Sequence, residues 1–191
     1  MDKLRKLAFE RRQVTRKTDN GEIRIEGLKI HFPPATLLQI KNSRVLDILE
    51  DKAYLSKPVL VHDGRVIFGE LAILRYLEKD QWKGVWVDSF HSHGRTDVLW
   101  SGMPPTGVPP ALPPKASEKF QAIKEQNGGR LSGFFDVFAW KEGGERDDFI
   151  FIEYKGRGDP ASENESEWIS AALAAGVKPE QLCIVGYDLP T

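Results

Sequence analysis

Two short runs of aromatic and β-branched residues constrain the fold of this chain most strongly. The first covers residues 133–140 and the second residues 149–155, with a polar, glycine-containing segment at 141–148 between them. Runs of this composition, bounded by glycine and charge, are typical of β-strands, and glycine supplies the positive φ that a hairpin loop needs. The sequence therefore predicts two antiparallel strands joined by a loop.

The register of this hairpin decides which side chains share a face. If Trp140 pairs with Phe149, then Asp136 lies directly opposite Glu153, and side-chain alternation places Lys155 on the same face. That face is also apolar near the loop, at Phe138, Trp140, Phe149 and Phe151, and the other face carries Phe135, Val137, Ala139, Ile150, Ile152 and Tyr154. A sheet that is apolar on both faces is normally covered on both faces.

The pairing of Asp136 with Glu153 is costly unless something binds there. Two carboxylates directly opposite each other repel and destabilise a hairpin. A divalent cation relieves this repulsion, and Mg²⁺ prefers one or two carboxylates with its other positions left to water and phosphate. Lys155 adds a positive charge that can orient a water molecule or stabilise a pentacovalent phosphate. The pattern predicts metal-assisted hydrolysis of phosphodiester bonds.

Asp136 followed by the Glu-Tyr-Lys at 153–155 resembles the signature of the PD-(D/E)xK nucleases. The continuation through the Trp-bearing segment 162–176 resembles the VRR-NUC branch of that superfamily, so that the resemblance covers about the last third of the chain. It implies an α/β (α+β) fold with a restriction-endonuclease-like mixed sheet flanked by helices. It also implies a Mg²⁺ or Mn²⁺ cofactor and DNA as the substrate, in replication, repair or phage biology.

Within that resemblance we expect Asp136 and Glu153 to hold the metal, with the backbone carbonyl of Ile152 as a further ligand. Lys155 would position and help activate the attacking water. The expected phosphate contacts, which flank the acidic end of the hairpin, are Arg130 and Arg157.

Two residues depart from the family pattern. Phe135 stands where the motif has proline, and Glu165 stands where the branch usually has glutamine, which adds an acid beside the expected metal site. Ser162, three residues before Glu165, also fits a capping box, in which the carboxylate has a purely structural task. Both interpretations of Glu165 stay open.

Nucleases of this fold often carry another glutamate on a helix ahead of the catalytic strands. Glu118, in a helix expected over residues 115–127, is the candidate by position, with Glu70 and Glu125 behind it. An acid near a helix start is also favoured by the helix dipole alone, so Glu118 equally suits a helix-face residue.

The first part of the chain reads as an α+β region. Residues 1–17 are strongly basic, and the spacing of their apolar residues predicts a short amphipathic helix, either a solvated helix or an arm that contacts phosphates. Further along we predict a strand, a helix, a hairpin with an Asp63-Gly64 turn, a helix and a strand, over residues 22–30, 35–55, 58–68, 69–79 and 84–90.

These patterns divide the chain into an N-terminal region over residues 1–98, a proline-rich linker or strap over 99–115, and a nuclease core over 116–191. The N-terminal region contains the candidates for the first helix and strand of the core, at 69–79 and 84–90. Its hairpin and helix also resemble the C-terminal half of a glutathione-transferase thioredoxin-like domain, although Glu70 stands in place of the glutathione-contacting serine.

Composition narrows the function further. A net charge of −1 gives no overall basic signature, so any nucleic-acid binding must use a local patch. A single cysteine, Cys183, excludes an internal disulfide and a cysteine-rich zinc site. His91 and His93, near Asp88, are better interpreted as a polar loop pair than as a metal site, because no third histidine or cysteine lies nearby.

We expect a cytoplasmic protein, since no stretch is long and apolar enough for a membrane span and the charged N-terminus lacks a signal-peptide core. The sequence thus predicts a metal-dependent deoxyribonuclease of DNA repair, replication or mobile elements, and it names no protein partner or oligomeric state. The alternatives are a nucleic-acid-binding module of the same fold without catalysis, and a thioredoxin-like small-molecule binder.

Overall fold

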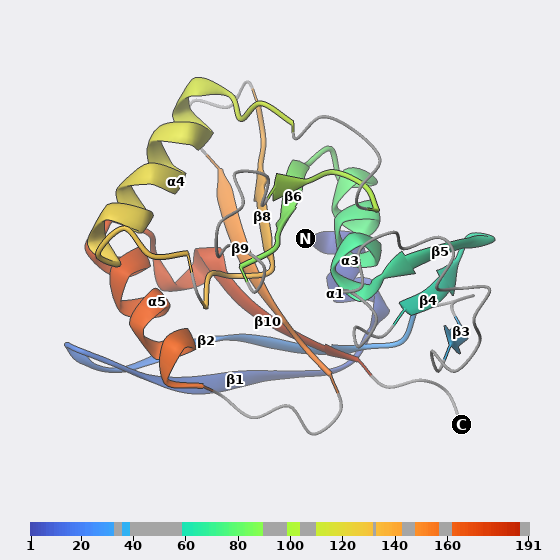
Figure 1. The fold of residues 1–191 in the computed structure, drawn as a ribbon. Helices are drawn as coiled ribbons and strands as arrows, with labels where there is room; N and C mark the ends of the chain where they lie inside the picture. The colour runs from blue at the N-terminus through green and yellow to red at the C-terminus, as the bar shows by residue number, and fades with distance from the viewer. Residues whose placement is uncertain are drawn as a thin grey trace.

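The predicted hairpin lies in the middle of a large mixed sheet (Figure 1). In this computed structural model, the described residues are 1–32, 36–38, 59–89, 99–103, 110–131, 133–142, 148–156 and 162–187. The strands of the large sheet are β1 (Ala8–Thr18), β2 (Gly21–Ile30), β6 (Lys83–Val87), β7 (Leu99–Trp100), β8 (Val137–Trp140), β9 (Phe149–Lys155) and β10 (Leu182–Tyr187). Their order across the sheet is β1-β2-β10-β9-β8-β6-β7.

The register on which the site depends is the predicted one. Strands β8 and β9 pair antiparallel, with Trp140 opposite Phe149 and Val137 opposite Ile152. Strand β10 then runs parallel to β9 on one side and to β2 on the other. The sheet therefore takes strands both from the predicted N-terminal region and from the predicted nuclease core. The predicted mixed α/β class is confirmed, and the sheet is consistent with a restriction-endonuclease-like core.

Helices cover both faces of the sheet, as the two apolar faces of the hairpin require (Figure 1). Helices α1 (Asp2–Leu7) and α3 (Gly69–Glu78) lie over the face that carries Val137 and Ile152. Helices α4 (Pro114–Gln126) and α5 (Glu163–Ala174) lie over the face that carries Phe138 and Phe151. A short 3₁₀ turn, η2 (Pro179–Gln181), leads from α5 into β10.

Phe135 was expected on the α1/α3 side and instead belongs to the other core. It packs against Phe134 and Phe151, at ring-centroid separations of 6.4 and 5.8 Å. The reason is that β8 begins only at Val137, so the strict alternation of a strand does not extend back to Phe135.

The short helix expected within residues 1–17 ends at Leu7, and most of this basic segment is a strand. The helix α1 covers Asp2–Leu7, and Ala8–Thr18 pairs with β2 along its length. Cross-strand pairing and the partial burial of side chains such as Val14 and Arg16 outweigh the local helical spacing. A turn at residues 19–20, with Gly21 at φ 112°, joins the two strands.

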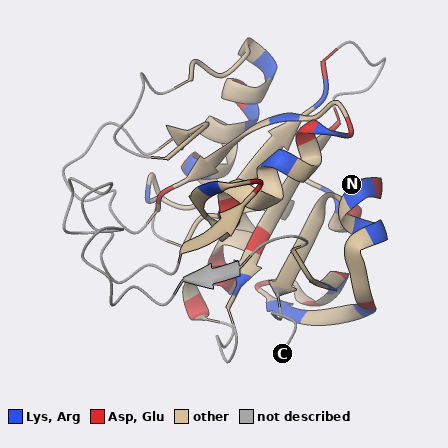
Figure 2. Ribbon diagram, turned by 90° about the vertical axis from the view of Figure 1, so that its right-hand side faces the viewer, with Lys and Arg blue, Asp and Glu red and all other residues tan. Residues whose placement is uncertain are grey.

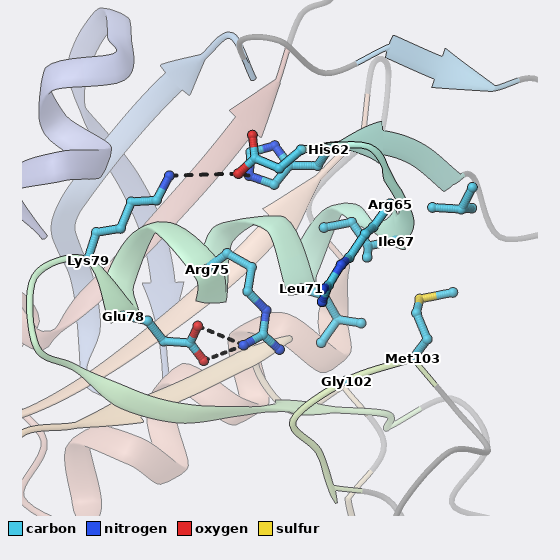
Figure 3. Close-up of a pocket in the computed structure, with 11 residues that line it drawn as sticks. His62, Arg65, Ile67, Leu71, Arg75, Glu78, Lys79, Gly102 and Met103 are labelled. Carbon is cyan, nitrogen blue, oxygen red and sulfur yellow. Dashed lines mark hydrogen bonds and ion pairs between the residues drawn. The ribbon is translucent and has the colours of Figure 1, made fainter.

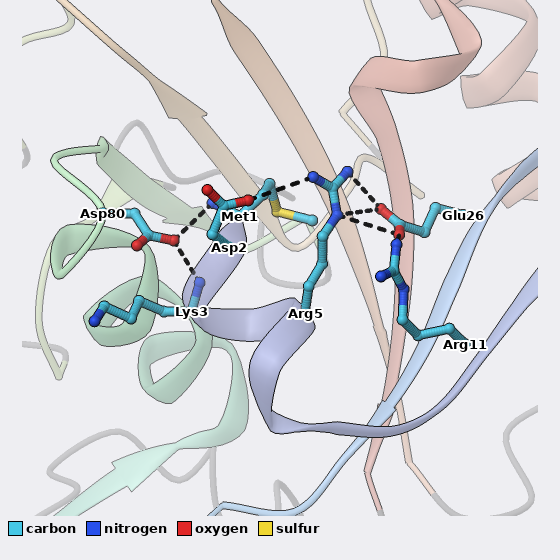
Figure 4. A network of polar contacts seen from close by, with 7 residues as sticks. All are labelled: Met1, Asp2, Lys3, Arg5, Arg11, Glu26 and Asp80. Carbon is cyan, nitrogen blue, oxygen red and sulfur yellow. Dashed lines mark hydrogen bonds and ion pairs between the residues drawn. The ribbon is translucent and has the colours of Figure 1, made fainter.

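Charged side chains fasten the start of the chain to the sheet and to the end of α3 (Figure 4). The terminal ammonium group of Met1 lies 3.0 Å from Asp80 Oδ2, and Arg5 and Arg11 each place a guanidinium nitrogen 2.8 Å from Glu26. Burial alone would raise the pKa of Glu26, but the hydrogen bonds from the two arginines outweigh it and lower that pKa. The N-terminal helix and the β1–β2 hairpin are therefore one tethered unit.

A smaller sheet in the order β3-β4-β5 is built from β3 (Thr36–Leu38), β4 (Val59–His62) and β5 (Arg65–Phe68). The predicted Asp63-Gly64 turn is confirmed, with φ at 48° and 74°, the two positive values of a type I′ hairpin turn. The helix expected over 35–55 is wrong at residues 36–38, which form β3, and otherwise lies outside the described residues.

The predicted helix at 69–79 is α3, and the strand that follows it, β6, pairs antiparallel with β8. Residues 104–109 of the proline-rich strap and 143–147 of the hairpin loop lie outside the described residues.

In the part of the chain that the structure covers, no helix has both the length and the hydrophobicity needed to cross a membrane.

Gly133 fixes the loop that leads into the site, and we expect its replacement to be costly. Its φ is 80°, and a Cβ built there would lie 2.6 Å from the Cβ of Asn164 in the first turn of α5. Gly129 is the matched control, because its φ is 78° but nothing lies within 4 Å of its Cβ position.

We predict that Gly129→Ala lowers the free energy of unfolding by roughly 1–2 kcal/mol, from backbone strain alone. Gly133→Ala should lose roughly 2–4 kcal/mol, since overpacking adds to the strain. Urea unfolding of the two variants measures the difference. Equal losses would mean that the Gly133 loop does not dock against α5 as described.

Candidate active site

The aspartate of the predicted pair is fixed from two directions. One residue beyond the Val137–Ile152 pair, Asp136 accepts a hydrogen bond at Oδ2 from the backbone N–H of Tyr154, at 2.8 Å. Its own carbonyl oxygen accepts from the N–H of Val87, at the end of β6, also at 2.8 Å. The Asp136 carboxylate is therefore held across β9, beside the strand that carries the Glu-Tyr-Lys sequence.

Lys155 lies between two carboxylates. Its Nζ is 2.9 Å from Glu153 Oε1 and 3.1 Å from Glu165 Oε2, and the side chains of Lys155 and Glu153 are each 13% exposed. Burial alone would lower the pKa of Lys155, but the charges and hydrogen bonds of Glu153 and Glu165 outweigh it and raise that pKa well above its ordinary value. Lys155 is therefore a firmly protonated cation in this arrangement.

Glu165 combines parts of both roles that the sequence left open. Ser162 caps α5, because its Oγ accepts a hydrogen bond from the Glu165 backbone N–H at 3.2 Å. The Glu165 carboxylate, which in a full capping box would turn back to the cap residue, has one oxygen against Lys155 and the other against Arg16. The backbone of Glu165 thus takes part in the helix cap, whereas its carboxylate contacts Lys155 and Arg16.

Arg16 is the member of this cluster that the sequence did not reveal. Its Nε lies 2.6 Å from Glu165 Oε1, although the two residues are 149 positions apart in the chain. Reading residues 1–17 as a surface helix hid the contact, because only the alternation of a strand places Val14 and Arg16 on the side of α5. The sequence feature that could have revealed Arg16 is the extra acid at 165. No lysine or arginine lies within several residues of Glu165, so a cation from elsewhere in the chain was needed to pair with it.

The remaining candidates lie elsewhere or cannot be placed. Glu118 and Glu125 are exposed residues of α4, and within the described residues Glu118 makes no hydrogen bond or ion pair with the cluster. Glu70 is buried in the first turn of α3, the helix that covers the opposite face of the sheet. Arg130 is exposed and lies 3.1 Å from Glu167. Arg157, His91 and His93 lie outside the described residues.

The oxygen atoms at this site suit a hard divalent cation. Asp136, just before β8, and Glu153, on β9, supply two carboxylates, and the backbone of Ile152 is adjacent to Glu153. The described residues contain no group of three or more His, Cys, Asp or Glu side chains able to hold a metal. Mg²⁺ does not require one, since it is commonly bound through one or two carboxylates with water and substrate phosphate completing its shell.

The cluster as a whole is formally negative, with three carboxylates against the two cations Lys155 and Arg16. A bound divalent cation would offset this net negative charge.

A mixed sheet that carries an aspartate opposite a Glu-x-Lys strand is the arrangement of the PD-(D/E)xK nucleases. Residues 109–184 match the family model of the VRR-NUC domain. The C-terminal part of this chain is accordingly a VRR-NUC domain, a nuclease domain of the PD-(D/E)xK type, as the sequence predicted. No curated protein and no solved structure gives a significant match to the chain. The matched segment includes Lys155 and Glu165 but not Arg16.

A separate cavity of about 820 Å³ lies beside α3 and the β4–β5 hairpin (Figure 3). Its described lining combines charged residues with apolar ones, which include Leu71 and Met103. The described lining contains no residue of the site around Lys155. Buried His62 lies at one end, with Nε2 3.5 Å from Asp63, whose carboxylate is 4.0 Å from Lys79 Nζ.

His62 makes stability depend on pH. Burial lowers the pKa of His62, the nearby Lys79 lowers it further, and Asp63 partly opposes them. Because the pKa in the unfolded chain is about 6.5, the unfolded state binds more protons as the pH falls. The stabilising contribution of neutral His62 is therefore complete above about pH 6.5 and is lost below it.

We predict that His62→Gln weakens the decrease in stability between about pH 7 and pH 5. Urea unfolding at a series of pH values compares the slopes for the variant and the unmodified protein. Parallel slopes would show that His62 does not titrate in this way.

Proposed function

We propose that this protein is a Mg²⁺- or Mn²⁺-dependent deoxyribonuclease that hydrolyses phosphodiester bonds. The observation that carries the proposal is that the Asp136 carboxylate is hydrogen-bonded to the Tyr154 N–H of β9 at 2.8 Å, in the same Glu-Tyr-Lys segment in which Lys155 lies 2.9 Å from Glu153. The VRR-NUC domain supports the nuclease class. DNA repair, replication or mobile-element biology and a cytoplasmic location remain parts of this proposal.

In this proposal Asp136 and Glu153 hold the metal, with the carbonyl of Ile152 as a further ligand. When bound, such an ion polarises the phosphate and lowers the pKa of a coordinated water. The Tyr154 N–H keeps the Asp136 carboxylate in place, so that the ligand is oriented before the ion binds.

Lys155 acts through its charge. Its ammonium group, held beside Glu153, orients the attacking water and stabilises negative charge that develops on the phosphate. It is not suited to remove the proton from that water, because two carboxylates hold it in the protonated form. The water proton would pass to solvent or to the phosphate.

Binding of DNA would rely on local contacts. Figure 2 shows basic and acidic residues interspersed along the described elements, in keeping with the net charge of −1. Arg130 is exposed and would exchange its contact with Glu167 for a phosphate, with Arg157 as the second expected contact.

Cleavage of single-stranded, duplex, flap and junction DNA with Mg²⁺, Mn²⁺ or EDTA tests the proposal. We predict that Asp136→Asn and Lys155→Ala each reduce the cleavage rate at least ~100-fold, because one removes a metal ligand and the other a charge at the phosphate. Lys83→Ala is the matched control, since Lys83 forms an exposed ion pair with Glu142 and should leave the rate unchanged.

Failure of the unmodified protein to cleave any of these DNAs, or full activity of Lys155→Ala, would contradict the proposal. DNA binding without metal-dependent turnover would favour the alternative of a binding module that keeps the fold without the chemistry.

Metal binding gives an independent readout. We predict that calorimetric titration with Mn²⁺ yields one site in the unmodified protein and at least ~10-fold weaker binding in Asp136→Asn. Equal affinities would remove Asp136 from the metal site.

The cavity beside α3 favours a second candidate, the small-molecule binder of thioredoxin-like type. Retention on immobilised glutathione, lost on addition of free glutathione, would support it.

A further inference from the structure

The ion pair between Arg16 and Glu165 is unusual because its carboxylate is buried and because it joins the first strand of the sheet to the helix beside Lys155. The atoms Nε and Oε1 are 2.6 Å apart, and the side chains are 16% and 3% exposed. A carboxylate this buried is stable only when it is paired, because removing its partner leaves an uncompensated charge away from water. The contact is therefore a constraint on the site and not a surface ion pair.

Strand β1 holds Arg16 in place on both sides. Two residues earlier, Val14 packs against the core under α4 and α5, and three residues later the backbone N–H of Asp19 donates to Ser170 Oγ in α5, at 3.1 Å. The backbone near Arg16 is thus held along α5, which directs the guanidinium group to the Glu165 carboxylate. None of β1 falls within the segment that matches the nuclease family.

The charges form a continuous alternating row: Arg16, Glu165, Lys155 and Glu153. Each oxygen of Glu165 faces one cation, so its charge is shared between Arg16 and Lys155. Without Arg16, the whole charge of Glu165 would act on Lys155, and one oxygen would lose its partner. Lys155 would then be drawn towards Glu165 and away from Glu153.

We propose that Arg16 is a positioning residue of the active site: it orients Glu165 and offsets its charge, so that the Lys155 ammonium stays between Glu165 and Glu153. This inference rests on the proposed nuclease function. It adds a contribution from the N-terminal strand to a site whose other members all lie in the VRR-NUC segment.

A double-mutant cycle tests the charge argument. Arg16→Gln should reduce kcat at least ~30-fold and change KM for DNA by less than ~3-fold, because misplacement of a catalytic group affects the chemical step. Glu165→Gln keeps the shape of the side chain but removes the charge that Arg16 offsets, so Arg16→Gln should cost no more than ~3-fold in kcat when it is added to Glu165→Gln.

Arg12→Gln is the matched control. Arg12 lies on the same strand, four residues earlier, but is 59% exposed and pairs only at 3.5 Å with Glu10. If the arginines of β1 merely attract DNA, both Arg→Gln variants should raise KM alike. That result, or an equal loss from Arg16→Gln in both backgrounds, would overturn the inference.

Thermal unfolding of the metal-free protein supplies a readout that does not need activity. It can also be measured if the Arg16→Gln protein is too unstable for a cleavage assay. Arg16→Gln should lower the midpoint by at least ~6 °C, whereas the double variant should lie above that single variant, because the unpaired buried carboxylate is gone. Additive shifts would overturn the inference whatever the activity. Coupled shifts in a protein that cleaves no DNA would overturn only the proposed function.

Discussion

The register of β8 against β9 is the constraint on which the rest of the structure depends. Side chains alternate with period two, so a slip of one residue would exchange the side chains that face the two cores and would shift Glu153 relative to Asp136. Two separate cores prevent the slip, because Phe138 and Phe151 stack in one while Val137 and Ile152 are buried in the other. The packing that stabilises the sheet thereby also sets the positions of the two carboxylates.

The site holds charged side chains that are largely removed from water. Their free energy cost is reduced because positive and negative groups alternate along the row. Removing one partner of a buried ion pair typically costs about 3–5 kcal/mol, so each member of the row from Arg16 to Glu153 depends on the next. Asp136 lies beside this row and is held by a backbone N–H. A divalent ion between Asp136 and Glu153 would extend the same alternation by one step.

Local patterns predicted the elements whose stability is local. The Asp63-Gly64 turn, the helix α3 and the Ser162 cap of α5 follow from backbone preferences and side-chain spacing within a few residues. The β8–β9 register was also predictable, because both strands are adjacent in sequence. Strand β1 was not, since its pairing with β2 and its contact with α5 replace a plausible helical pattern, and Arg16 was missed with it.

The N-terminal hairpin has a role in the sheet that explains why its arginine reaches the site. Strand β10 pairs with β9 on one side, and its other side would be an open edge if β2 did not pair with it. The β1–β2 hairpin covers that edge and continues along α5, as the contact of Asp19 with Ser170 shows. Strand β1, the outer strand of this hairpin, is thus brought alongside the helix that carries Glu165. Once Arg16 occupies that position, the buried acid beside Lys155 has a partner, so the strand pairing at this side of the sheet and the electrostatics of the site depend on the same segment.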